Sequence, residues 1–290
     1  MSVADTRVTF ASGAVHGTGT VVLVHHDADG AVVVLDETPF HPVDHTWPDQ
    51  PGDTGILRAG GVEHAVVDTL MAAVDAHGAV AIGTEIPVKR GEDGWTWLVA
   101  HRLDRPDAPV ELAVGATVDA EVDAARRAAL SRGHSACHLA ALALNAATTG
   151  LWSKDIGLDA LGAANFDLRA GQSSRIRPDG SVDEYRLGKS LRRSGFDAAS
   201  FAADLDAHRD VINAKLREWV ASGALSRIET DGPTIVDRRT WHCVLPEGEA
   251  AILCGGTHVS SLGEFAEVSV SFAQPDAQTV VMTTTAVPAE

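Results

Sequence analysis

Short apolar and β-branched segments, separated by Gly, Asp and Pro, fill most of the first 125 residues. A repeat of two residues, with apolar and polar positions alternating, is typical of strands that have one buried face. We therefore predict strands near residues 8–10, 20–26, 31–35, 95–102 and 118–122. A small β-barrel is the natural arrangement for strands of this number and length.

Two segments of this part depart from the strand pattern. Residues 38–55, TPFHPVDHTWPDQPGDTG, contain too much Pro, Asp and Gly for regular structure and are long enough to form a functional loop. In residues 62–76, apolar side chains recur at helical spacing, which predicts one amphipathic helix. The side chains that form its apolar face are Val66, Leu70, Ala73 and Val74.

After residue 125 the pattern changes to helices interleaved with strands. Asp123 is suited to cap an Ala- and Leu-rich helix that runs to about residue 147 and contains one glycine, Gly133. A second helix is predicted over residues 197–220. Further strands are predicted at residues 182–187, 225–229, 240–245, 251–254 and 266–272. The fold class is thus α+β, with an N-terminal β-barrel domain of residues 1–125 and a second domain of residues 126–290 with an antiparallel sheet.

Composition excludes several classes of protein. The chain is 45% hydrophobic and 22% charged, as in ordinary globular proteins. No apolar run approaches the roughly 20 residues that a bilayer requires, and the start, MSVADTRVTF, does not resemble a signal peptide. We therefore expect a cytoplasmic protein without a membrane partner. The three cysteines, Cys137, Cys243 and Cys254, are too few for a disulfide framework and leave thiols for metal binding or burial.

The formal net charge of −17 is unevenly distributed. Residues 1–125 carry 20 acidic and 6 basic side chains, whereas residues 126–290 carry 20 and 17. Such acidity argues against DNA binding and against general binding of nucleic acids. Any contact with a phosphate backbone is expected in the second domain.

Two short motifs carry metal-binding chemistry. RGHSACH places His134 and His138 four residues apart on the predicted helix, so both imidazoles project from one face. CGGTH supplies Cys254 and His258 on a turn between predicted strands. Zinc suits imidazole and thiolate ligands at roughly 2.0 to 2.3 Å in tetrahedral geometry. We predict one Zn²⁺ per chain on His134, His138 and Cys254, with His258 as a fourth ligand or as a polar group beside an open position.

The same segments resemble a known family. RGHSACHLAALAL and CGGTHV are similar to the HxxxH and CxxxH segments of the editing domains of alanyl-tRNA synthetase and of the freestanding AlaX-type deacylases, in the same order and at a similar separation. Residues 38–55 partly match the glycine-rich loop of the longer AlaX proteins, and the resemblance covers nearly the whole chain. It implies a zinc-dependent trans-editing enzyme that hydrolyses the ester between an amino acid and the terminal ribose of a tRNA, and so serves translation fidelity.

The loop differs from the family's pattern. Between Pro42 and Gln50 it has no glycine and about three extra residues, among which are His45 and Trp47. His45 and Thr257 are candidate polar groups of the amino-acid pocket, together with His258. The resemblance implies small substrates such as serine or glycine mischarged on alanine tRNA. The altered loop leaves open a specialised deacylase for a threonine-like residue, of the fluorothreonyl-tRNA deacylase kind.

A zinc ion can lower the pKa of a coordinated water to about 7 and polarise an ester carbonyl, so no protein nucleophile is required. Alternatively, the metal orients the amine or side-chain hydroxyl of the substrate, and a separately held water attacks. Basic side chains are expected to contact the acceptor end of the tRNA. The candidates are Arg175, Arg177, Lys189, Arg192 and Arg193, with Arg238 and Arg239 as a further pair.

Two other functions stay open on the sequence alone. The strong acidity also suits a zinc hydrolase of small aminoacyl esters that does not use tRNA. Four protein ligands would close the coordination sphere, which is typical of a noncatalytic module with a structural zinc.

Overall fold

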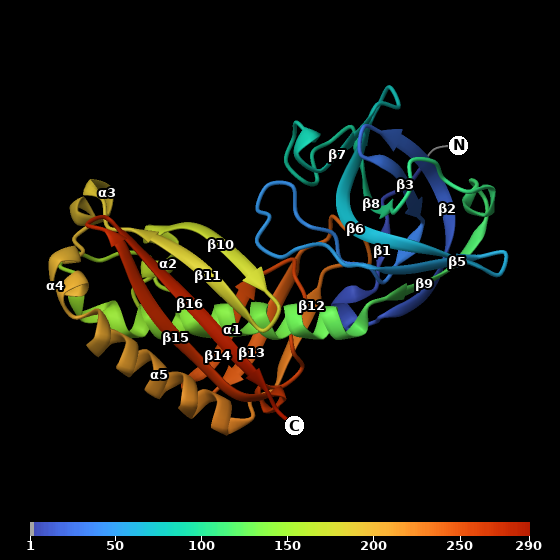
Figure 1. The fold of residues 1–290 in the computed structure, drawn as a ribbon. Helices are drawn as coiled ribbons and strands as arrows, with labels where there is room; N and C mark the ends of the chain where they lie inside the picture. Colours follow the sequence, from blue (N-terminus) through green and yellow to red (C-terminus); the bar gives the residue numbers. More distant parts are fainter. Residues whose placement is uncertain (1–2) are drawn as a thin grey trace. The chain divides into compact units, whose positions relative to one another are not determined.

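The computed structural model describes residues 3–290, and the chain divides into two compact units (Figure 1). The first comprises residues up to Arg127 together with Ile228–Arg239 and Cys254–Thr257. The second comprises Ala128–Arg227, Thr240–Leu253 and His258–Glu290. Antiparallel sheets and a few helices make up the fold, so the predicted α+β class is confirmed.

A seven-stranded antiparallel sheet builds the first unit. Its strands pair in the order β5-β9-β2-β3-β8-β6-β7, and β5 also pairs with β6. Their bounds are β2 (His16–Asp27), β3 (Gly30–Leu35), β5 (Gly55–Ala59), β6 (Val62–Asp75), β7 (Val80–Ile82), β8 (Trp95–Leu103) and β9 (Thr117–Val122). A short parallel pair, β1 (Arg7–Val8) and β4 (Glu37–Thr38), lies outside this sheet.

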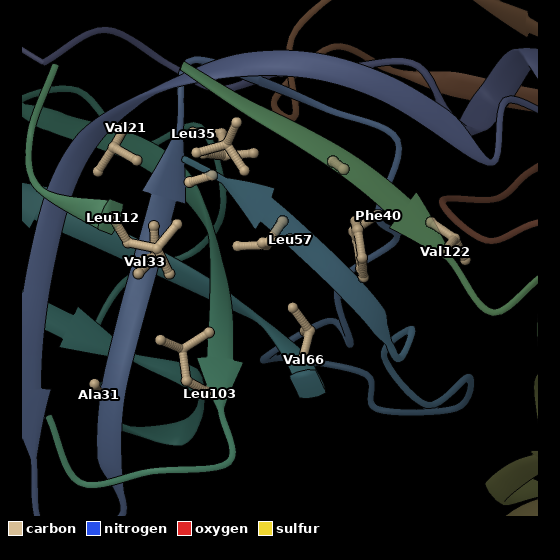
Figure 2. Close-up of a cluster of buried hydrophobic side chains, with 13 residues drawn as sticks. Val21, Ala31, Val33, Leu35, Phe40, Leu57, Val66, Leu103, Leu112 and Val122 are labelled. Carbon is tan, nitrogen blue, oxygen red and sulfur yellow. The ribbon is translucent and has the colours of Figure 1, made fainter. Parts of the chain in front are cut away.

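The buried face of this sheet follows the alternation in the sequence. In β9, Val118, Ala120 and Val122 are buried, whereas Thr117 and Asp119 are exposed. Figure 2 shows the labelled side chains of the cluster, which come from six strands of the sheet and from Phe40 and Leu112, gathered into one apolar core. Burial of each large apolar side chain stabilises the fold by about 1.5–3 kcal/mol. This gain explains why apolar residues occupy every second position of strands such as β9.

The helix predicted over residues 62–76 is wrong, because this segment is the strand β6. It pairs with β5, β7 and β8. Val66, Leu70 and Val74 are four residues apart, and a spacing of four fits a period of two as well as it fits a helix. The β-branched residues of the segment favour the strand, and the pairing partners on both sides decide between the two.

Helices and further strands make up the second half of the chain. The helices are α1 (Ala124–Thr148), α2 (Phe166–Ala170), α3 (Lys189–Arg193), α4 (Ala198–Ala203) and α5 (Leu205–Ser222). The strands are β10 (Gly171–Arg177), β11 (Gly180–Arg186), β12 (Ser226–Thr230), β13 (Arg239–Leu245), β14 (Gly248–Leu253), β15 (Phe265–Asp276) and β16 (Thr279–Pro288). They form one sheet in the order β10-β11-β16-β15 and another in the order β12-β13-β14. Among residues 3–290, no helix combines the length and the apolar character needed to cross a membrane.

The ends of the helices follow local chemistry. The Asp123 carboxylate accepts a hydrogen bond of 3.0 Å from the backbone N–H of Arg126, which confirms the predicted cap of α1. The helix predicted over residues 197–220 is instead two helices. Asp204, with φ −123° and ψ 32°, separates α4 from α5.

Gly133 allows the β10–β11 hairpin to pack closely against α1. A Cβ on Gly133 would lie 2.2 Å from the carbonyl oxygen of Arg177 and 2.6 Å from that of Gly180. No side chain fits in that space, so the hairpin backbone packs directly on the helix. This contact holds the hairpin against α1 at the residue immediately before His134.

Candidate metal centre

Four side chains from the two motifs converge on one point. His134 and His138 project from α1, Cys254 directly follows β14, and His258 lies four residues further along the same connection. Each offers one ligand atom, and these atoms all lie within 4.8 Å of one another. The cluster can therefore hold one metal ion, as the spacing of the motifs predicts.

The three imidazole rings pack closely against one another. The ring centroid of His134 lies 4.9 Å from that of His138 and 4.4 Å from that of His258. The centroids of His138 and His258 are 5.1 Å apart. The fully buried indole of Trp241, on β13, stacks on His138 at 5.1 Å and lies 5.4 Å from His258. Trp241 therefore packs against two of the imidazoles.

His138 has the protonation state that a metal ligand needs. Burial lowers the pKa of its imidazole to about 4, so the ring is neutral at pH 7. Its Nε2 atom is buried and has no hydrogen-bond partner among residues 3–290. A buried polar atom without a partner is costly, and a cation at this position would satisfy it. The donor set thus fits a metal ion.

Cys254 completes the set with sulfur. Burial raises the pKa of its thiol to about 12, and a hydrogen bond from the backbone of Gly256 only partly offsets this effect. A divalent cation reverses the balance, because it favours the thiolate and releases the proton. Three imidazoles and one thiolate form a set that zinc binds well.

Thr257 is held by a side chain from the predicted loop. Its backbone N–H donates to Gln50 Oε1 at 3.0 Å, and Gln50 Nε2 donates to Thr257 Oγ1 at 2.9 Å. Both side chains are buried. Cys254 N also donates to the carbonyl oxygen of Arg239 at 3.0 Å, so both ends of the 254–257 turn are anchored.

His45 is not one of the four clustered residues. Its Nε2 atom lies 2.9 Å from the carbonyl oxygen of Val88, and its ring centroid lies 5.5 Å from that of Trp97. A cavity of about 330 Å³ borders it, lined partly by Val43 and Leu70. Trp47, the other bulky residue of this loop, is 52% exposed.

The candidate tRNA-binding residues fall into two separate groups. Arg175 and Arg177 are exposed near the turn of the β10–β11 hairpin. The exposed basic residues of α3 follow the other end of β11, roughly 20 Å of strand away. These residues are Lys189, Arg192 and Arg193.

Arg239 does not belong with them, and its prediction as a phosphate contact is wrong. Only 3% of it is exposed, and its guanidinium donates to the carbonyl oxygens of Thr234, Ile235 and Asp237. Burial lowers the pKa of this side chain to about 10. It stabilises a loop of the first unit instead of presenting charge to a ligand.

Three residues near the cluster were not singled out from the sequence. Trp241 is apolar in a predicted strand, which suggests core and nothing more. Gln50 was noted only as part of the loop. Ser135, beside His134, carries no signal that separates it from an ordinary helical serine.

No protein-family model matches the sequence.

Proposed function

We propose that this chain is a zinc-dependent aminoacyl-tRNA deacylase of the AlaX type, acting in trans in the cytoplasm. Its substrate would be a small amino acid on a tRNA that should not carry it, such as serine or glycine on alanine tRNA. The observation that carries the proposal is the convergence of His134, His138, Cys254 and His258 within 4.8 Å, in motifs that resemble those of the editing enzymes.

The residues of the chain have distinct parts in this proposal. His134, His138 and Cys254 would hold the zinc ion, and His258 would be a fourth ligand or border an open position. When bound, zinc supplies Lewis acidity that polarises an ester carbonyl and makes a water more acidic. The stacked Trp241 excludes bulk water from one side, which strengthens electrostatic interactions in the site. Thr257 and His45 are the proposed pocket groups that select the amino acid.

Two structural parts of the proposal go further than the α+β class. We infer that the sheet of the first unit closes as a small β-barrel, and the pairing of β5 with both β9 and β6 supports this. We also infer that Arg175 and Arg177, with the basic residues of α3, contact tRNA phosphates. Few such contacts would give weak, salt-sensitive binding that allows product release.

A noncatalytic module is the second candidate. The favouring observation is that four protein side chains lie close enough to bind one ion. If all four bind, the coordination sphere is closed, as in structural zinc sites.

A deacylation panel tests the proposal. Zinc-reconstituted protein is incubated with seryl-, glycyl-, alanyl-, threonyl- and fluorothreonyl-tRNA, each prepared on alanine and threonine tRNAs. We expect zinc-dependent hydrolysis of at least one of them, with loss of activity in His138→Ala and no change in His77→Ala, which alters an exposed histidine.

The other outcomes separate the rivals. If every aminoacyl-tRNA stays intact while the protein retains zinc and unfolds when zinc is removed, the zinc is structural. If free aminoacyl esters are cleaved and tRNA gives no stimulation, the protein is a small-ester hydrolase.

A further inference from the structure

We propose that Ser135 is a positioning residue that fixes His258 as a metal ligand through its Nε2 atom. The inference depends on the metal-binding part of the proposed function, and not on tRNA as the substrate. It assigns a role to a serine that lies between the two motif histidines of α1 and offers no ligand itself.

Ser135 contacts both the ring and the backbone of the His258 segment. Its side chain is fully buried, and its Oγ atom lies 3.2 Å from His258 Nδ1. The same oxygen accepts a hydrogen bond of 3.0 Å from the backbone N–H of Val259. One hydroxyl therefore restrains the imidazole of His258 and the peptide that follows it.

The proton on the imidazole follows from this arrangement. A neutral imidazole carries one N–H, and the nitrogen that binds a metal must be the unprotonated one. Nδ1 is the nitrogen that faces Ser135, so a His258 that binds the metal through Nε2 carries its proton on Nδ1 and donates it to Oγ. Nε2 is then left with its lone pair for the metal.

The serine hydroxyl has the capacity for both bonds. An Oγ atom has two acceptor lone pairs, one of which receives the N–H of Val259, so the other can receive the Nδ1–H of His258 in the proposed tautomer. A group that accepts a hydrogen bond from the other ring nitrogen orients a ligating histidine, and its loss typically lowers metal affinity about 10- to 100-fold. Alanine at position 135 would remove both restraints at once.

A matched variant separates the two restraints. Ser226 Oγ donates to the carbonyl oxygen of Val259, the residue whose backbone N–H donates to Ser135 Oγ. Ser226→Ala therefore loosens the same backbone segment and leaves the Ser135 hydroxyl beside the imidazole in place. Ser135→Thr keeps the hydroxyl and tests whether that group alone is required.

Zinc affinity is measured by competition with a chromophoric chelator, with no tRNA present. We expect Ser135→Ala to weaken zinc binding about 10- to 100-fold. The zinc affinity of Ser135→Thr should stay within about threefold of that of the unchanged protein. The zinc affinity of Ser226→Ala should equal that of the unchanged protein. Cobalt absorption spectra of each variant report whether the ligand set is complete, and circular dichroism reports folding.

Two results would overturn the proposal. If Ser135→Ala folds and binds zinc with unchanged affinity, the serine does not position the ligand. If Ser226→Ala loses as much affinity as Ser135→Ala, the backbone anchor is what matters. Should Ser135→Ala fail to fold, ¹H–¹⁵N spectra of the unchanged, zinc-loaded protein decide: a proton on Nδ1 of His258 supports the proposal, and zinc bound at Nδ1 contradicts it. None of these measurements uses tRNA. If the protein hydrolyses no aminoacyl-tRNA but its zinc affinity depends on Ser135, only the proposed function is refuted.

Discussion

Gln50 and Thr257 are 207 positions apart in the sequence and share two hydrogen bonds, one to the backbone and one to the side chain of the threonine. Both residues are almost completely buried. A loop of the first half of the chain thus anchors the turn that begins at Cys254 and ends beside His258. The loop therefore supports the segment that carries two residues of the candidate metal centre, Cys254 and His258.

Replacing Gln50 should loosen this turn. Gln50→Ala leaves the buried backbone N–H of Thr257 without its acceptor, and such a loss costs about 1–3 kcal/mol. We expect a decrease of that size in the free energy of unfolding, measured in urea, together with weaker zinc binding. Gln172→Ala is the control, because Gln172 is exposed and its side chain donates to the neighbouring carbonyl oxygens of Ala170 and Gly171. Equal stability of the two variants would show that the pair does not anchor the turn.

Alanine at position 133 should destabilise the protein, although alanine is normally the better helix former. In an exposed helix this change gains about 1 kcal/mol. Here the added Cβ would lie 2.2 Å from the Arg177 carbonyl oxygen, which belongs to backbone and cannot rotate away. Overpacking of this kind costs about 1–3 kcal/mol, so we expect a net loss in thermal unfolding experiments. Gly157→Ala meets no atom within 4 Å and should change stability by less than about 0.5 kcal/mol. A Gly133→Ala protein more stable than its parent would contradict the close packing of the hairpin.

His101 should make the stability depend on pH. It is fully buried, its Nδ1 lies 2.8 Å from the carbonyl oxygen of Val33, and its Nε2 lies 2.8 Å from Thr38 Oγ1. Burial lowers its pKa from 6.5 to about 4. Between these values the unfolded chain binds a proton that the folded chain does not, so stability is complete above pH 6.5 and is lost as the pH falls toward 4.

The size of this effect is set by the shift, and roughly 3 kcal/mol is its upper range. Urea unfolding at pH 7 and pH 5 measures it. His101→Gln removes the titrating group, so its loss of stability between these pH values should be smaller than that of the unchanged protein. The exposed His77→Gln should keep the full loss. An unchanged pH dependence in His101→Gln would rule out this histidine as the source.

The elements that could be predicted from the sequence are those determined by neighbouring residues. The strands with clear alternation, such as β9, and the capped start of α1 both follow from neighbouring residues. The helix prediction for residues 62–76, the segment that forms β6, was wrong because its apolar spacing fits either period and only its partner strands decide. The four residues of the candidate metal centre could be found because the spacing within each motif is fixed and cysteine is rare in the chain. Contacts such as those of Ser135 with His258 join residues 123 positions apart, and no local pattern marks them.

The most direct test of the account is zinc K-edge X-ray absorption of the reconstituted protein at one metal per chain. The account predicts a first shell of one sulfur at about 2.3 Å and imidazole nitrogens at about 2.0–2.1 Å, with the sulfur lost in Cys254→Ser. A shell of oxygen and nitrogen without sulfur, or a zinc content that His134→Ala leaves unchanged, would contradict it.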